Sequence, residues 1–278
     1  MSAEVGPTHL LLDGPFSNRG LANLVGLEGL FGLSFFGHSS AFTPAGLEPL
    51  AELPNLGFLG CGGELCDDEA MRRIAALPRL RMLMGQGTVA GDEGFTALSR
   101  SSTIEYIWGR ECPNLTGRGF RALARMPSLK GLAVSCRNVD DEALSTLPRF
   151  PALQELMPMD VRDEGFRHVG RCPQLEALWC MYCRDTTDVA TEHIAGLSGL
   201  KTYYAGATQI TDRSLEILGR MSSLERIELY ECQGVSDAGL ASLARLPGLR
   251  QVALHGLPQV TLEGTAVFPA HVRVDHSL

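Results

Sequence analysis

The sequence predicts an α/β solenoid in which short parallel strands alternate with short helices along the whole chain. Three observations predict it: a leucine framework that recurs at a nearly constant interval, a strand-like alternation in the first half of each repeat, and helical spacing of leucines in the second half. The 278 residues are 45% hydrophobic and 20% charged, which is typical of a folded globular chain.

The framework is clearest in residues 224–249, which read LERIELYECQGVSDAGLASLARLPGL. Its first leucine position recurs at intervals of 22 residues (Leu153 to Leu175) to 26 residues (Leu30 to Leu56). The distance from the helix start to the next copy is fixed at 14 residues, for example from Val235 to Leu249. All length variation therefore falls in the loop between strand and helix, where insertions are tolerated. The repeat covers residues 10 to about 262.

The first half of each repeat predicts a short strand. The segment RIELY, residues 226–230, alternates apolar residues with variable ones, so that Ile227 and Leu229 face inward. Pro158 falls at an inward position of another strand, and a proline has no N–H to give to a sheet. We expect a local break or bulge there.

The second half of each repeat predicts a short helix. Residues 236–245 space their leucines as one face of a helix does, and Ser236 before an aspartate suits the N-cap. Pro247 follows the last helical leucine and ends the helix. One strand and one helix in each repeat leave no room for separate domains. We expect a single domain over 1–278 with about 10–11 repeats, a lead-in at 1–9 and a C-terminal cap at about 256–278.

Frames of the form L-x-x-L-x-L-x-x-C stand at Ile104–Cys112, Leu175–Cys183 and Leu224–Cys232. They resemble the leucine-rich repeat family, in the cysteine-containing subtype of F-box substrate receptors and bacterial relatives. The resemblance implies a right-handed horseshoe with a parallel sheet on the concave side and helices on the convex side, used as a scaffold for recognition. We expect no F-box, because the first repeat begins by residue 10, and His38 interrupts the cysteine ladder. Abundant arginine with scarce lysine favours a bacterial source.

Charge and hydropathy exclude several classes of partner. The net charge of −8 argues against nucleic acid, which requires clustered cations. The N-terminus lacks the basic start and long apolar stretch of a secretory signal, and no apolar run approaches the roughly 18 residues of a membrane span. With eight cysteines and no signal peptide, a cytoplasmic protein with free thiols is expected.

Strand alternation predicts which side chains point onto the concave face. The predicted binding residues on that face are Phe36, Phe58, Met82, Met84, Tyr106, Trp108, Arg110, Glu155, Met157, Met159, Trp179, Met181, Tyr204, Arg226, Glu228 and Tyr230. They include both tryptophans, three of the five tyrosines and five of the nine methionines. Because a large apolar patch marks an interaction site, and Trp, Tyr and Arg are typical of interfaces, the sequence predicts a module that binds a protein or peptide.

Other interpretations of this face remain open. A loop or terminus of the chain could cover it, or it could join two copies in a homodimer, for which the N-terminal end is the other candidate. An inhibitor or immunity-type protein for a basic enzyme would suit the acidic charge. A host-directed effector or a ubiquitin-ligase adaptor would need a second domain. A small-ligand binder or enzyme would use a central concave pocket around Trp108 and Trp179.

Motifs that carry chemistry are missing from the sequence. No phosphate loop, zinc-protease, nucleophile-elbow or calcium-loop pattern appears, so we expect no enzyme activity, no cofactor and no metal site. The segment WCMYC, residues 179–183, has the spacing of a redox pair or half a zinc site. The repeat accounts for that spacing, because Cys180 is an inward strand residue and Cys183 is the ladder cysteine.

Overall fold

The computed structural model describes residues 8–35 and 42–277, which form two compact units. Unit 1 falls within Met1–Ala143 with Arg149–Ala152, and unit 2 within Leu144–Pro148 with Leu153–Leu278. Both units repeat a strand followed by a helix, as the sequence predicts. That the whole chain is one domain stays a prediction. The predicted binding residue Phe36 and the substituted ladder position His38 lie outside the described residues.

Unit 1 has short strands and helices that alternate along the chain. Its strands are β1 (His9–Leu12), β2 (Gly32–Phe35), β3 (Phe58–Cys61), β4 (Met82–Met84), β5 (Tyr106–Gly109) and β6 (Gly131–Ser135). Its α-helices are α1 (Asn18–Ala22), α2 (Asp68–Ala75), α3 (Asp92–Leu98) and α4 (Gly117–Leu123). Two 3-10 helices, η1 (Pro44–Glu52) and η2 (Gly63–Leu65), take part in the early repeats. Helix α5 (Asp141–Leu144) and the 3-10 helix η3 (Leu147–Arg149) follow β6.

Unit 2 continues the same alternation more regularly. Its strands are β7 (Glu155–Met159), β8 (Ala177–Met181), β9 (Thr202–Gly206), β10 (Arg226–Tyr230), β11 (Gln251–His255) and β12 (Arg273–Ser277). Its helices are α6 (Asp163–Val169), α7 (Asp188–Ile194), α8 (Asp212–Leu218), α9 (Asp237–Leu243) and α10 (Leu262–Thr265). The predicted cap at about 256–278 thus contains one further helix and a strand that pairs in parallel with β11.

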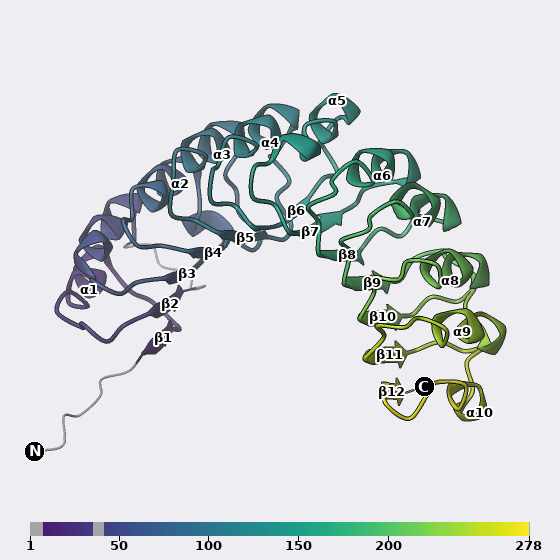
Figure 1. Cartoon of the computed structure of the whole chain (residues 1–278). Helices are drawn as coiled ribbons and strands as arrows, with labels where there is room; N and C mark the ends of the chain where they lie inside the picture. Colours follow the sequence, from purple (N-terminus) through teal and green to yellow (C-terminus); the bar gives the residue numbers. More distant parts are fainter. Residues whose placement is uncertain (1–7, 36–41, 278) are drawn as a thin grey trace, which may run out of the picture. The chain divides into compact units, whose positions relative to one another are not determined.

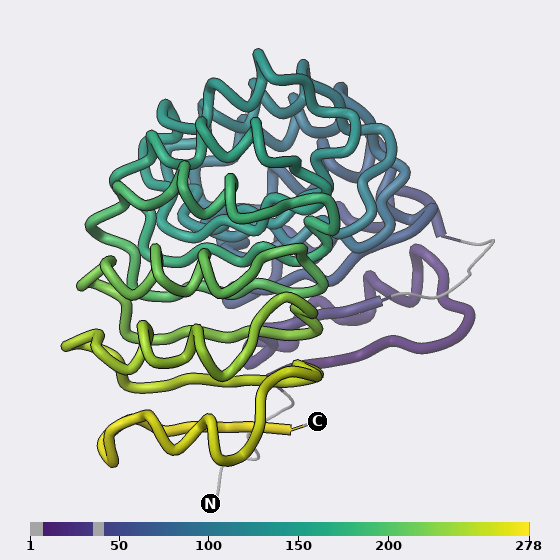
Figure 2. Tube along the Cα trace, turned by 90° about the vertical axis from the view of Figure 1, so that its right-hand side faces the viewer, coloured from purple at the N-terminus to yellow at the C-terminus, as the bar shows by residue number. Residues whose placement is uncertain are grey.

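Within each unit the strands are parallel and follow one another in chain order. Helices of unit 1 lie on one side of strands β1–β6, and those of unit 2 lie on one side of strands β7–β12 (Figure 1). Figure 2 shows the repeats of unit 2 as successive stacked coils. This arrangement is the strand and helix stacking that the repeat length predicts.

The strand register confirms the predicted inward positions. Equivalent residues pair across neighbouring strands, such as Leu83 with Ile107 in unit 1 and Ile227 with Val252 in unit 2. Each of these four side chains is buried. They form, with the helical leucines, a core between sheet and helices, and each buried Leu or Ile contributes roughly 1.5–3 kcal/mol.

The predicted break at Pro158 is confirmed in the pairing of β7. Strand β7 pairs with β8 only at Glu155 and Leu156, whereas β8 and β9 pair over five positions. Pro158 is buried, and its carbonyl accepts a hydrogen bond from Cys183 Sγ at 3.1 Å. Because proline has no N–H to donate, the ladder with β8 does not continue past Leu156.

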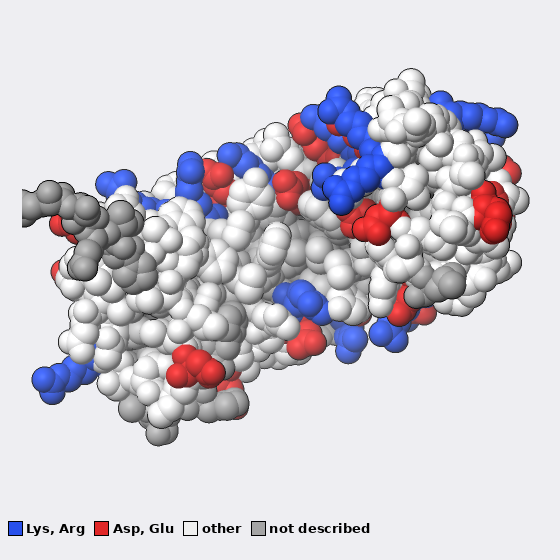
Figure 3. All heavy atoms as spheres, turned by 90° about the horizontal axis from the view of Figure 1, so that it is seen from below, with Lys and Arg blue, Asp and Glu red and all other residues white. Residues whose placement is uncertain are grey.

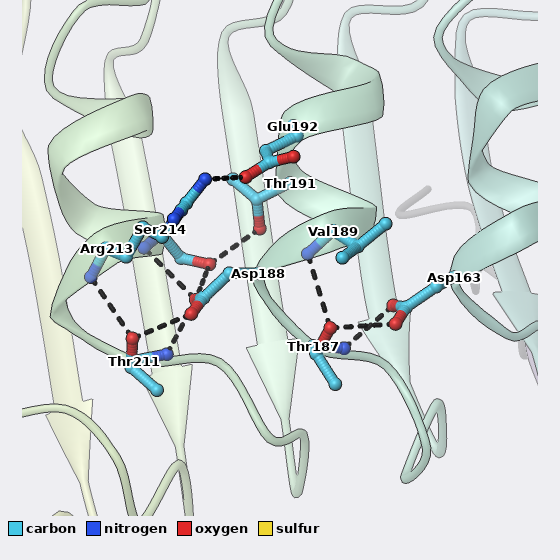
Figure 4. Close-up of polar contacts among 9 residues, drawn as sticks. All are labelled: Asp163, Thr187, Asp188, Val189, Thr191, Glu192, Thr211, Arg213 and Ser214. Carbon is cyan, nitrogen blue, oxygen red and sulfur yellow. Dashed lines mark hydrogen bonds and ion pairs between the residues drawn. The ribbon is translucent and has the colours of Figure 1, made fainter.

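Aspartates at the helix starts join one repeat to the next (Figure 4). Asp188 accepts hydrogen bonds from Thr211 N at 2.9 Å, Thr211 Oγ1 at 2.8 Å and Ser214 Oγ at 2.5 Å. Asp163 receives the same pair of bonds from Thr187. A threonine before an aspartate predicts a helix N-cap followed by the first turn, and Thr187 and Thr211 do cap α7 and α8. The aspartate carboxylates in addition accept hydrogen bonds from the N-cap threonine of the following repeat.

These hydrogen bonds hold the carboxylates in their charged form. Burial alone would raise the pKa of Asp188, but hydrogen bonds from Ser214 and Thr211 outweigh it and lower the pKa. In unit 1, Asp92 behaves in the same way: burial opposes the charge, and bonds from Thr116 and Gly119 lower its pKa.

Most of the described repeats turn sharply after their strand, with one residue in the left-handed backbone region. Glycine occupies this position at Gly87 and Gly256, with φ of 65° and 62°. Larger residues occupy it elsewhere, including Tyr182 (φ 59°), Ala207 (φ 54°) and Glu231 (φ 51°). A side chain in this region costs roughly 1–2 kcal/mol. The alternation of the strand therefore does not predict the direction of the side chain at this turn residue.

Candidate functional site

Unit 1 presents aromatic and methionine side chains on the strand face opposite its helices. We define the unit 1 patch as Phe58, Met82, Met84, Tyr106, Trp108 and Arg110. Strand register places Met82 beside Tyr106 and Met84 beside Trp108, and Phe58 stands beside Met82 on the next strand. The patch is thus contiguous across β3, β4 and β5. Of the predicted residues that the structure describes in this unit, strand pairing brings together Phe58, Met82, Met84, Tyr106 and Trp108, and Arg110 follows β5 directly after Gly109.

The unit 1 patch is accessible and supported by close packing. Trp108 is 42% exposed, and the other members of the patch are half-buried. The ring of Tyr106 lies over Gly131, where a Cβ would come within 2.4 Å of Tyr106 Cδ1. Such packing of a ring on a glycine of the neighbouring strand orders the ring. Seen from below in Figure 3, the strand side of unit 1 is mostly uncharged, with acidic and basic groups in small separate clusters.

Phe31 belongs with this surface, although strand alternation does not predict it. The side chain is 44% exposed, contacts the edge of His9 at a centroid distance of 5.7 Å, and lies over Gly57. Phe31 stands one residue before β2, so the strand alternation does not reach it. The signal that identifies it is the glycine at the equivalent position of the next repeat.

Unit 2 carries a second surface of the same kind. We define the unit 2 patch by the predicted residues Glu155, Met157, Trp179, Met181, Tyr204, Arg226, Glu228 and Tyr230. Trp179 pairs in register with Tyr204, which pairs with Glu228. Tyr230 pairs with Gly206, which pairs with Met181 on the other side. Tyr230 is 43% exposed and Arg226 is exposed, whereas the others are half-buried.

Met159 is an exception to the predicted face. Its side chain is only 3% exposed, so the expectation of an accessible Met159 is wrong. The alternation that predicts its direction holds only while the strand is regular. Beyond Leu156 the pairing with β8 stops, and Asp160 takes the left-handed conformation, with φ of 63°.

Three tyrosines of unit 2 lie close to one another. Burial raises the pKa of Tyr204 to about 12, and the charges of Cys232, Glu228, Tyr230 and Tyr182 act in the same direction. Tyr182, which is not among the predicted binding residues, is 37% exposed. Alternation would place Tyr182 inward, but its left-handed backbone turns it out.

Two carboxylates of the unit 2 patch differ in their surroundings. Burial raises the pKa of Glu155, and the nearby charge of Glu176 raises it further. Glu228 is half-buried, and in the described part of the chain its carboxylate makes neither a hydrogen bond nor an ion pair. The only basic residue of the unit 2 patch is Arg226, two residues before Glu228 on the same face of β10.

The cysteines have the surroundings of core residues. All eight are free and buried, including Cys180 and Cys183 of the WCMYC segment. Burial raises the pKa of Cys183 to about 12, and burial also raises the pKa of Cys180. A protonated thiol is neither a nucleophile nor a good metal ligand. Among the residues that the structure describes, no group of three His, Cys, Asp or Glu side chains is suited to a metal ion.

Comparison with solved structures bears on the fold. The chain is similar to a chain of the crystal structure of the Rad7 and Elc1 complex in yeast, with 20% identity, a TM-score of 0.66, and coverage of 93% of this chain and 72% of that chain. The fold is a leucine-rich-repeat solenoid. An internalin (inlF) from Listeria monocytogenes is also similar, at 15% identity over 98% of this chain and 87% of that chain, with a TM-score of 0.48. No protein-family model matches the chain. None of the solenoid's helices, over the residues described, has the length and apolar character that a membrane crossing requires.

Proposed function

We propose that the protein is an interaction module that binds a protein or peptide on its strand faces. The observation that carries the proposal is the unit 1 patch, in which Met84 and Trp108 stand side by side on the strand face opposite the described helices of unit 1. Contiguous apolar patches on a protein surface mark interaction sites, and Trp, Tyr and Met are enriched where proteins meet.

The side chains suit recognition better than catalysis. Rings packed on glycine, such as Tyr106 on Gly131, are ordered before binding, so little conformational entropy is lost on contact. Methionine adapts to the shape of a partner. No nucleophile with an adjacent base is found among the members of either patch, and we infer a role without catalysis.

Structural similarity supports the proposal in a general way. The similar chain from yeast belongs to a complex of two proteins, Rad7 and Elc1. We extend only the general role, binding of a protein partner, to this chain. The cysteine-containing subtype, the bacterial source, the cytoplasmic location and a homodimer through the strand face or the N-terminal end stay predictions.

Affinity capture tests the proposal. The full chain is immobilised, exposed to a lysate of its native organism, and the retained proteins are identified by mass spectrometry. The double variant Trp108→Ala, Trp179→Ala should lose the partner while its thermal unfolding midpoint stays nearly unchanged, because neither indole is in the core.

A matched control removes apolar surface from the helix side. Val189 is the second residue of α7 and is 40% exposed. Leu262 is the first residue of α10 and is 73% exposed. The variant Val189→Ala, Leu262→Ala should retain the partner. Equal capture by all three proteins would exclude the strand faces as the binding surface.

An inhibitor of a basic enzyme is the second candidate. The net charge of −8 favours it, because an acidic surface steers toward a basic one. A captured basic enzyme that loses activity in a 1:1 complex would identify this role, and a captured partner that is acidic or has no enzymatic activity would exclude it.

A further inference from the structure

We propose that the tyrosine cluster of unit 2 binds an arginine side chain of the partner. The cluster consists of Tyr182, Tyr204 and Tyr230 with the carboxylates of Glu228 and Glu231. It lies within the proposed binding surface, so this role depends on the proposed function and specifies the chemistry of the partner.

The cluster is organised around a missing side chain. Gly206 lies in register between Met181 and Tyr230, and the ring of Tyr204 extends over it. A Cβ at position 206 would lie 2.7 Å from both Tyr204 Oη and Tyr204 Cε1. The glycine thus allows the phenol of Tyr204 to approach Tyr230. Aromatic surface is gathered here from β9, β10 and the turn after β8.

The charge of the cluster is negative and incompletely matched. Glu228 is half-buried among the rings and has no ion pair or hydrogen bond with any residue that the structure describes. Glu231 accepts a hydrogen bond from Tyr230, which is a neutral partner. A carboxylate that loses water to neighbouring rings is stabilised when a cation approaches it.

Arginine fits this combination better than other side chains. Aromatic faces attract cations, and the planar guanidinium stacks on rings while its N–H groups donate to a carboxylate. The chain's own candidate for this place is Arg226, on the same face of β10 as Glu228. Arg226 is exposed and forms no ion pair with the described residues. The place beside Glu228 is therefore open to a guanidinium from outside.

Nuclear magnetic resonance titration of the full chain tests the site without knowledge of the partner. The probe is N-acetyl-arginine amide, and the matched probe is N-acetyl-citrulline amide, which has nearly the same shape without the charge. Ring signals of Tyr204 and Tyr230 and the methyl signal of Met181 should shift saturably with the arginine probe and much less with the citrulline probe.

Variants connect the binding to the carboxylate. Glu228→Gln and Tyr230→Leu should each weaken arginine binding about five- to tenfold. Glu216→Gln removes an exposed glutamate on helix α8 and should leave the binding unchanged. Arg226→Gln should strengthen binding, because it removes the neighbouring positive charge.

Several outcomes would overturn the arginine site. These are equal shifts with the two probes, no saturable shift with arginine, or unchanged arginine binding in Glu228→Gln. They would leave the proposed function intact if the tryptophan double variant still loses its captured partner. Conversely, the chain could bind the arginine probe while the tryptophan double variant captures the same partners as the unchanged protein. That result would contradict the proposed function and not the arginine site.

Discussion

The phenol of Tyr204 lies directly over Gly206, so that a Cβ at position 206 would lie 2.7 Å from Tyr204 Oη. This relationship decides the shape of the unit 2 patch, because the missing side chain makes the space into which the ring extends. The same principle operates in unit 1, where Tyr106 lies over Gly131. In both units a glycine on the strand face leaves the space that an aromatic ring occupies.

Gly206→Ala should therefore disturb the tyrosine cluster. The added methyl group requires the Tyr204 ring to move, and we expect a roughly five- to tenfold loss of arginine-probe affinity. Gly196→Ala is the matched control, since a Cβ there meets nothing within 4 Å. Titration of both variants checks the prediction, and equal affinities would show that the position of the ring does not matter.

Asp188→Ala should destabilise unit 2 by roughly 2 kcal/mol, because it leaves the donors of Thr211 and Ser214 without their charged acceptor. Asp185 is an exposed aspartate of the preceding loop, whose carboxylate lies 3.6 Å from Arg162 Nε. Asp185→Ala should change stability by less than about 0.5 kcal/mol. Urea unfolding of the two variants makes the comparison, and similar losses would contradict a special role for Asp188.

The same carboxylates predict how stability depends on pH. The pKa values of Asp92 and Asp188 are lowered in the folded chain, so their contribution is complete above the unfolded value of about 3.9 and is lost as pH falls through the lower folded values. We expect the free energy of unfolding to fall steeply below about pH 4. In Asp188→Ala this fall should be shallower. An identical pH profile would mean that Asp188 titrates normally in the folded state.

Ala207→Gly should stabilise the protein by about 1 kcal/mol, because Ala207 has a φ of 54° and glycine occupies the equivalent position at Gly256. Ala238→Gly, in the first turn of α9, is the opposite control and should destabilise by roughly 0.5–1 kcal/mol. Thermal and urea unfolding would check both. Loss of stability in Ala207→Gly would show that the turn is not strained.

The fold was predictable from the sequence because each repeat contains the same residue pattern of one strand followed by one helix. The alternation correctly separates Leu83 from Met82 and Ile107 from Trp108, since each of these strands keeps its regular register. Where the backbone departs from the repeat, the prediction fails. Met159 follows a proline that ends the pairing, and its side chain is buried.

The missed parts of the candidate site have a similar physical origin. Tyr182 is turned outward by a left-handed backbone that only a residue-by-residue φ reveals. The part played by Asp188 in the next repeat depends on a contact 23 residues away in sequence, from Thr211 N. A sequence pattern identifies Asp188 as a residue of a helix start, and the contact between repeats appears only when they are stacked.

Site-specific photo-crosslinking shows whether a partner contacts the strand face. The photoreactive amino acid p-benzoylphenylalanine is placed at Met84 on the strand face of unit 1, or at Val189 on helix α7, and the protein is irradiated in cells of its native organism. We expect a crosslinked partner from position 84 and none from position 189. A partner crosslinked from position 189 and not from position 84 would contradict it.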